Sequence, residues 1–297
     1  MNEQVDAFKT LLAESLGEGG KARSVTQMRE GYEALGSAFP PGDDWQCQRV
    51  DARGVPAELS HCGGSGRSTL LYLHGGGYVI GSLATHRGLV ANIARATAGH
   101  VLAIDYRLAP EHPFPAAVAD AVCAYRWLLE SNRDQRSIVI AGDSAGGGLT
   151  VATLLKLKQE DLPLPAAGVC ISPWVDMEAV GESMDRKASV DPMVQREGLL
   201  GMAEAYLAGA DPRDPLAAPI YGELTGLPPL LIQVGTAETL LDDARRLATA
   251  AITCGVDVDY QEWPDMIHVF QHFAAMISDG FRAIDRIGAF VRHHTNS

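Results

Sequence analysis

Long hydrophobic runs are missing from this chain of 297 residues. No stretch approaches the about 18 consecutive apolar residues that a membrane-spanning helix needs. The opening residues, MNEQVDAFKTLLAESLGEGG, have no basic segment followed by an unbroken apolar one. We therefore expect no secretion signal and no contact with a membrane.

The sequence has few cysteines, and fewer basic than acidic residues. The five cysteines are odd in number and widely spaced, with no C-x-x-C pair, which favours a reduced, cytoplasmic location and speaks against a metal site. The chain has only 24 Lys and Arg but 37 Asp and Glu, so its net charge is −13. A surface this negative repels phosphate backbones, and we expect no nucleic-acid partner.

Short apolar runs alternate with helical patterns from about residue 68 onward. Runs that are apolar at nearly every position suit strands buried on both faces of a mostly parallel sheet. The expected strands are STLLYLHGGG, HVLAIDYR, RSIVIAGDS, AAGVCISPW, PPLLIQVGT and VDVDYQEWP, preceded by a hairpin formed by QCQRVDA and GVPAELSHC. The sequence thus predicts an α/β fold whose chemistry lies in the loops after the strands.

Helical patterns flank and interrupt this alternation. Apolar residues recur at steps of three and four in two stripes near the N-terminus, which predicts two amphipathic helices. The first stripe is Val5, Phe8, Leu12 and Leu16, and the second is Val25, Met28, Tyr32, Leu35 and Phe39. Residues 177–222 contain no convincing strand but include the helix-like LLGMAEAYLAG, so we interpret them as an inserted lid.

The sharpest motif is GDSAG, residues 142–146, which follows one expected strand and opens an expected helix. In a G-x-S-x-G elbow the serine occupies a strained turn that leaves its hydroxyl exposed, and the flanking glycines allow the chain to fold tightly. Ser144 is the predicted nucleophile, although the motif alone also occurs by chance. We expect the neighbouring Asp143 to polarise the site or order the turn rather than to react.

A serine hydroxyl needs a general base, and that base needs an acidic partner. In an elbow fold both follow the serine on loops after late strands. Of nine histidines, His268 in PDMIH fits best, and His272 is the alternative, four residues into the apparent last helix. Glu238 lies just beyond a buried strand and is preferred as the acid over Asp242, because Asp242 and Asp243 are more simply interpreted as helix N-caps.

Attack on a carbonyl builds negative charge on oxygen, which backbone N–H groups stabilise. The glycine-rich HGGGYVIGS follows a strand, and we assign the oxyanion donors to Gly76, Gly77 and Ala145. A nucleotide-binding loop is the alternative, but the glycine spacing is off and no G-K-[ST] follows.

The chain contains four motifs in this order: HGGGYVIGS, DYRLAPEHPFPAA, GDSAGGGLT and PDMIHVF. Together they resemble the bacterial hormone-sensitive lipase family of α/β-hydrolases, and the resemblance extends over most of residues 68–295. The resemblance implies a carboxylesterase without cofactor or metal and a cap formed by residues 1–45 together with 177–222, on a catalytic domain of residues 46–297. It matches Ser144, His268 and the three oxyanion donors, whereas Glu238 replaces the usual aspartate and Val269 replaces a common glycine.

The resemblance extends to the polar segment 105–117, whose side chains we expect to be structural: Asp105, Tyr106, Arg107, Glu111 and His112. It also implies a possible homodimer through the sheet edge near residues 256–263. Short to medium acyl esters are the expected small-molecule substrates, and the candidate substrate-binding residues are Tyr78, Leu199, Met202 and Tyr206, with Leu200 as a further pocket wall. An amidase, lactonase or carbamate hydrolase with the same triad and a non-catalytic binding protein of this fold remain alternatives.

Overall fold

The computed structural model describes residues 4–5, 8, 24–64, 66–131 and 133–295. Strands in this part of the chain form one eight-stranded sheet in the order β1-β2-β4-β3-β5-β6-β7-β8. Their bounds are β1 (Gln46–Asp51), β2 (Pro56–His61), β3 (Thr69–Leu73), β4 (His100–Ile104), β5 (Ile138–Asp143), β6 (Ala167–Ile171), β7 (Leu230–Gly235) and β8 (Val258–Trp263).

The pairs β1–β2 and β2–β4 are antiparallel, so β2 runs opposite to the other strands, and the remaining pairs are parallel. The predicted α/β fold with a mostly parallel sheet is confirmed. Each of the eight strands coincides with a run singled out in the sequence. The central strands β3, β5, β6 and β7 are buried at every position, and strands buried on both faces leave a nearly continuous apolar run.

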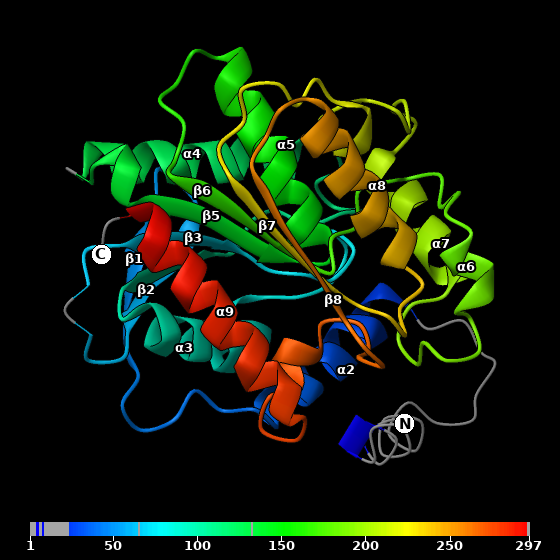
Figure 1. Cartoon of the computed structure of the whole chain (residues 1–297), viewed down its shortest axis with the longest axis horizontal. Coiled ribbons are helices and arrows are strands. Elements are labelled where there is room, and N and C mark those ends of the chain that lie inside the picture. The colour runs from blue at the N-terminus through cyan, green and yellow to red at the C-terminus, as the bar shows by residue number, and fades with distance from the viewer. Residues whose placement is uncertain (1–3, 6–7, 9–23, 65, 132, 296–297) are drawn as a thin grey trace.

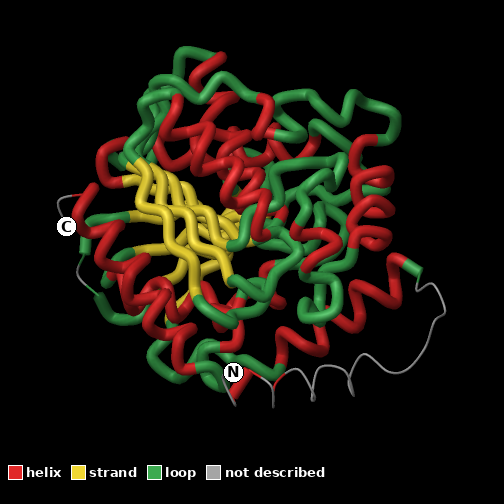
Figure 2. Tube along the Cα trace, turned by 45° about the vertical axis from the view of Figure 1, so that its right-hand side comes forward, coloured by secondary structure: helices red, strands yellow, loops and turns green. Residues whose placement is uncertain are grey.

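Helices cover both faces of the sheet (Figures 1 and 2). Alternate residues of each strand enter different cores: Leu71 and Leu73 pack with one set of helices, and Leu70 and Tyr72 with the other. The described helices are α2 (Val25–Ser37), α3 (Leu83–Thr97), α4 (Ala116–Glu130), α5 (Ala145–Gln159), α6 (Ser183–Arg186), α7 (Arg196–Leu207), α8 (Leu241–Thr253) and α9 (Ser278–Thr295), with the 3-10 turns η1 (Gln135–Ser137), η2 (Pro219–Tyr221) and η3 (Phe270–Phe273).

The two terminal regions differ in part from expectation. Leu12 and Leu16 lie outside the described residues, and α2 ends two residues before Phe39. The prediction that His272 lies in the last helix is wrong: it belongs to η3, and α9 begins only at Ser278. The physical reason is visible at Val269, whose φ of +47° turns the chain sharply before a regular helix can start.

Residues 177–222 are all described and contain α6, α7 and η2 but no strand. Figure 1 shows α6 and α7 on the same side of the molecule as α2.

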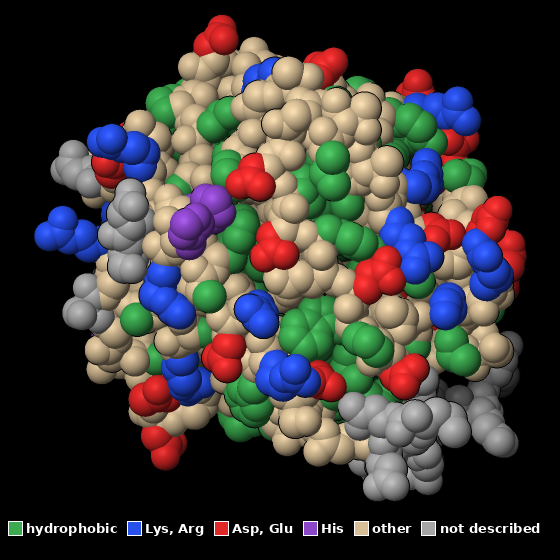
Figure 3. Space-filling model, viewed as in Figure 1, with side chains coloured by type: hydrophobic (Ala, Val, Ile, Leu, Met, Phe, Trp, Pro, Cys, Tyr) green, Lys and Arg blue, Asp and Glu red, His purple; other side chains and the backbone are tan. Residues whose placement is uncertain are grey.

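Two observations concern contact with membranes and with charged partners. No helix in the described part of the chain is long and apolar enough to span a bilayer. On the face shown in Figure 3, acidic and basic side chains are interspersed rather than gathered into a field of one sign.

Candidate active site

Ser144 lies at a sharp turn between β5 and α5. Its φ of 54° and ψ of −119° are strained for a residue with a side chain. The flanking glycines permit the turn, because a Cβ at Gly142 would collide with the carbonyl of Gly146, and a Cβ at Gly146 with the carbonyl of Leu73. This strand–elbow–helix geometry is the one that exposes a nucleophilic serine.

Glu238 and His268 form a buried pair at the carboxyl end of the sheet. His268 Nδ1 lies 2.9 Å from Glu238 Oε2, and the two residues are 4% and 0% exposed. Burial by itself would lower the pKa of His268, but the hydrogen bond and charge of Glu238, with the charges of Asp191 and Asp143, raise it above its ordinary value. A carboxylate bonded to Nδ1 leaves Nε2 as the atom available to accept a proton.

Ser172 was not singled out from the sequence. Its hydroxyl donates to Glu238 Oε1 at 2.7 Å and accepts from the Val269 N–H at 3.2 Å, while the Gly235 N–H also donates to Oε1 at 2.6 Å. The signal that points to Ser172 is its place directly after β6, at the same edge of the sheet as the elbow.

Residues 171–172 contact both the turn at Ser144 and the residue after His268. The Ser144 N–H donates to the Ile171 carbonyl at 2.8 Å, and the Val269 N–H donates to the Ser172 hydroxyl. No hydrogen bond joins the Ser144 hydroxyl to His268 in this structure, as is common in a site without substrate.

The glycine-rich loop follows β3. Gly76 and Gly77 have φ values of +116° and +61°, which favour glycine, and their N–H groups make no hydrogen bond to a described residue. The Ala145 N–H, first in α5, has no acceptor within its own helix. These three groups are therefore available to bind an anion.

Asp143 lies beneath this loop and is 1% exposed. Its Oδ1 accepts from the Tyr72 hydroxyl at 2.7 Å and from the Gly75 N–H at 3.1 Å, and its Oδ2 lies 3.3 Å from His86 Nε2. Burial would raise the pKa of Asp143, but the charge and hydrogen bond of His86 and the hydrogen bond of Tyr72 lower it below its ordinary value. The carboxylate thus supports the turn before Gly76.

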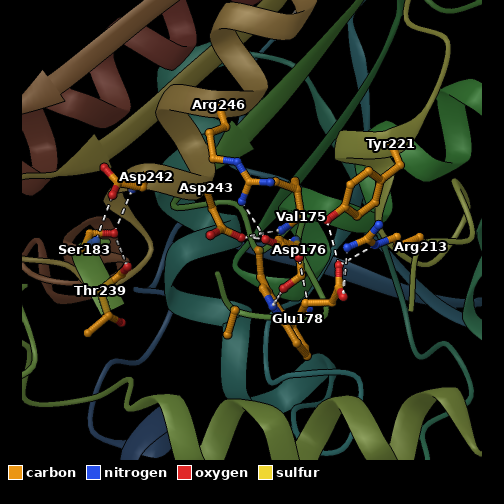
Figure 4. A network of polar contacts seen from close by, with 12 residues as sticks. Val175, Asp176, Glu178, Ser183, Arg213, Tyr221, Thr239, Asp242, Asp243 and Arg246 are labelled. Carbon is orange, nitrogen blue, oxygen red and sulfur yellow. Dashed lines mark hydrogen bonds and ion pairs between the residues drawn. The ribbon is translucent and has the colours of Figure 1, made fainter. Parts of the chain in front are cut away.

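The alternative acids point elsewhere, as Figure 4 shows. Asp242 accepts from the Ser183 N–H at 2.8 Å, and Asp243 accepts from the N–H groups of Val175 and Asp176, both at 3.1 Å. Neither side chain bonds to His268. Both lie in the first turn of α8 rather than at its N-cap, which is Leu240, so their interpretation as N-caps is wrong. They are held instead by segments from residues 175–183.

The alternative base is also placed elsewhere. His272 is 6% exposed and contacts the His86 ring edge-on at 5.3 Å. Burial lowers the pKa of His272 to about 3, with the charge of His86 adding to the effect. His272 has no carboxylate hydrogen bond, in contrast to His268.

Helix α7 contacts the glycine-rich loop. Tyr206 stacks on Tyr78 with ring centroids 3.8 Å apart, and a Cβ at Gly77 would collide with the Met202 sulfur. Leu199 is buried, whereas Leu200 is 40% exposed. Of the candidate substrate-binding residues on α7, Met202 therefore lies against Gly77, one of the predicted oxyanion donors.

The polar segment after β4 ties loops together. Tyr106 donates to the His74 carbonyl at 2.7 Å, Arg107 pairs with Asp120, and Glu111 pairs with Arg29. A cavity of about 410 Å³ lies against this region, lined by Glu33, Glu58 and Asp105 among others, and none of the candidate catalytic residues lines it. No group of His, Cys, Asp or Glu in the described residues is arranged to hold a metal.

Known proteins share this architecture over nearly the whole chain. A family with the alpha/beta hydrolase fold matches residues 70–272. An acetyl-hydrolase of Streptomyces hygroscopicus is 49% identical over 91% of both chains. A crystal structure of an esterase from the bacterial hormone-sensitive lipase family superposes with a TM-score of 0.96 at 49% identity, covering 99% of each chain.

The chain belongs to the bacterial hormone-sensitive lipase family of esterases. A crystal structure of EstE5 soaked with p-nitrophenyl butyrate is also similar to this chain, with 44% identity, a TM-score of 0.96 and full coverage of both chains. The predicted resemblance is confirmed.

Proposed function

We propose that this esterase hydrolyses short to medium acyl esters by acyl transfer, with Ser144 as nucleophile, His268 as general base and Glu238 as the acid. The observation that carries the proposal is the buried 2.9 Å contact of Glu238 with His268 Nδ1, beside a serine elbow with φ of 54°. We assign the oxyanion donors to Gly76, Gly77 and Ala145.

The steps follow from this geometry. The Ser144 Oγ attacks the ester carbon while His268 Nε2 takes the hydroxyl proton. The carbonyl oxygen becomes an oxyanion, which each preorganised N–H donor stabilises by about 3 kcal/mol. His268 then returns the proton to the leaving alcohol, and water releases the acyl group by the same route. Glu238 stays ionised and stabilises the imidazolium.

The substrate size rests on two kinds of support. An acetyl-hydrolase is among the relatives, and EstE5 was soaked with p-nitrophenyl butyrate, an ester of a four-carbon acid. In this chain Met202 occupies the space above Gly77, which favours a small acyl group at the predicted oxyanion site.

The remaining proposals concern the cellular location and the oligomeric state. We propose a cytoplasmic location, supported by five unpaired cysteines. We also propose a homodimer through β8, which is the last strand in the sheet order and has one unpaired edge. The reaction as written needs neither a cofactor nor a metal.

The test is Ser144→Ala measured with p-nitrophenyl butyrate. We expect folded protein with kcat reduced at least about a thousandfold and no labelling by a fluorophosphonate probe, which requires an activated serine. Ser60→Ala is the matched control, because Ser60 is buried in β2 and its hydroxyl faces the Val101 carbonyl. Near-normal turnover of Ser144→Ala would refute the assignment, and hydrolysis of amides but not esters would favour the amidase alternative.

A further inference from the structure

The predicted oxyanion loop has a conformation that its own contacts do not fully secure. Gly76, Gly77 and Tyr78 have successive φ values of +116°, +61° and +61°. The left-handed region costs a residue with a Cβ, such as Tyr78, about 1 kcal/mol or more. Inside the loop, the N–H groups of Val79 and Ile80 donate to the Gly76 carbonyl at 3.1 and 2.9 Å. The carbonyls of residues 78 and 79 are left for partners outside the loop.

Those partners come from α2 and from the segment after β4. Arg29 of α2 donates through Nε to the Val79 carbonyl at 2.9 Å and through Nη2 to the Ala109 carbonyl at 3.0 Å. The Ala109 N–H donates in turn to the Tyr78 carbonyl at 2.9 Å. One guanidinium therefore links the Val79 carbonyl of the oxyanion loop to the segment after β4, whose Ala109 N–H holds Tyr78.

Glu111 fixes the direction of that guanidinium. Its two oxygens accept from Arg29 Nη1 at 2.8 Å and Nη2 at 2.7 Å, a bidentate geometry that restricts rotation of the planar group. The Arg29 side chain is 31% exposed and that of Glu111 is 54% exposed. An ion pair this exposed adds little stability, so its main effect is on orientation.

We propose that Arg29 is a positioning residue for the oxyanion hole, and that α2 is thereby part of the catalytic apparatus as well as of the cap. The inference rests on the proposed function, because it assigns the N–H groups of Gly76 and Gly77 to the oxyanion. Arg29 does not touch the reacting atoms. It acts through the Val79 carbonyl, and displacement of the loop by a fraction of an ångström weakens the donors only where charge develops in the transition state.

The experiment compares Arg29→Gln with Arg95→Gln. Arg95 is a matched control: it holds the same N-terminal segment to α3 through the Pro41 carbonyl and the Asp44 carboxylate, but it does not contact the oxyanion loop. Each variant is assayed for kcat and KM with p-nitrophenyl butyrate, for melting temperature, and for inhibition by an alkyl trifluoromethyl ketone, which forms a tetrahedral adduct with the serine.

We expect Arg29→Gln to lower kcat about 10- to 100-fold, with KM changed less than about twofold and ketone inhibition weakened by a similar factor to kcat. Arg29→Lys should recover part of kcat, because an ammonium can donate to one carbonyl. Glu111→Gln keeps the Arg29 guanidinium but removes the carboxylate that orients it, so its loss of kcat should be smaller. Arg95→Gln should keep kcat and ketone affinity.

Two results would overturn the inference. One is unchanged kcat in Arg29→Gln. The other is an equal fall of kcat in Arg29→Gln and Arg95→Gln that follows their melting temperatures and leaves ketone affinity intact. Failure of the proposed function is separate: it would appear as a wild-type protein that neither hydrolyses the ester nor reacts with fluorophosphonate.

Discussion

Ser172 donates its hydroxyl hydrogen to Oε1 of Glu238, while His268 contacts the other carboxylate oxygen, Oε2. The same hydroxyl accepts the N–H of Val269, the residue after His268. One small side chain therefore orients the predicted acid and braces the backbone that carries the predicted base.

Ser172→Ala should lower kcat/KM about tenfold without unfolding the protein. The variant leaves Glu238 Oε1 with the Gly235 N–H alone, and hydrogen bonds to a charged group contribute about 1.5–3 kcal/mol. Steady-state kinetics with p-nitrophenyl butyrate measure the change. Ser183→Ala is the control, since Ser183 is also buried but bonds to the Thr239 carbonyl. Equal losses in both variants would contradict a specific role for Ser172.

The pH profile should separate Glu238 from Asp242. As a base His268 must be neutral, and Glu238 raises its pKa. The midpoint of the rise in kcat/KM with pH should therefore lie above the ordinary histidine value of about 6.5. In Glu238→Gln the raising charge is lost and burial remains, so the midpoint should move to lower pH and kcat should fall about a thousandfold.

Asp242→Asn is the matched control for that profile. It removes a carboxylate four residues after Glu238, in the first turn of α8, that bonds to the Ser183 N–H and not to His268. We expect its midpoint to be unchanged and kcat to stay within a few-fold. A larger loss in Asp242→Asn than in Glu238→Gln would show that Asp242 is the acid.

Met202→Ala should broaden the acyl preference. Removing the thioether that lies over Gly77 opens space beside the predicted oxyanion donors. The ratio of kcat/KM for p-nitrophenyl octanoate to that for the acetate should rise several-fold, measured across a chain-length series. Met202→Leu keeps the volume and should retain the wild-type ratio. An unchanged ratio in Met202→Ala would place the acyl group elsewhere.

Asp243→Asn should change how stability depends on pH. Burial, with the charge of Asp176 adding to it, raises the pKa of Asp243 to about 7, although Arg246 and two backbone N–H groups oppose this. The folded protein then binds the proton more tightly than the unfolded chain, so stability falls as pH rises from about 4 to 7, by up to about 1.4 kcal/mol per pH unit.

The asparagine variant keeps an acceptor for Val175 and Asp176 without the charge. The melting temperature of this variant should not fall between about pH 4 and 7 as that of the wild type does. At pH 8 it should exceed the wild-type value by about 3 °C or more. Thermal unfolding at pH 5, 6, 7 and 8 measures this, with Asp242→Asn expected to follow the wild type. Parallel curves for Asp243→Asn and wild type would show that Asp243 stays ionised in the folded state.

Residue patterns predicted the centre of the sheet well because its strands are buried on both faces, as residues 69–73 are at every position. Patterns near the C-terminal end were less reliable. Residues 270–273 have an apolar rhythm that suits a helix, yet the left-handed turn at Val269 limits them to a 3-10 turn. The N–H of Val269 donates to the Ser172 hydroxyl, a contact with a residue far away in the sequence. No local pattern reveals such a contact.

The sequence by itself determined the order of the elements, the elbow at Ser144 and the choice of His268, since all three depend on local chain geometry and on position along the chain. Only the tertiary structure decided which carboxylate His268 contacts, the place of Ser172 beside Glu238, and the reach of Arg29 to the loop of Gly76 and Gly77. These contacts join segments distant in sequence, and their existence depends on how the sheet brings its carboxyl ends together.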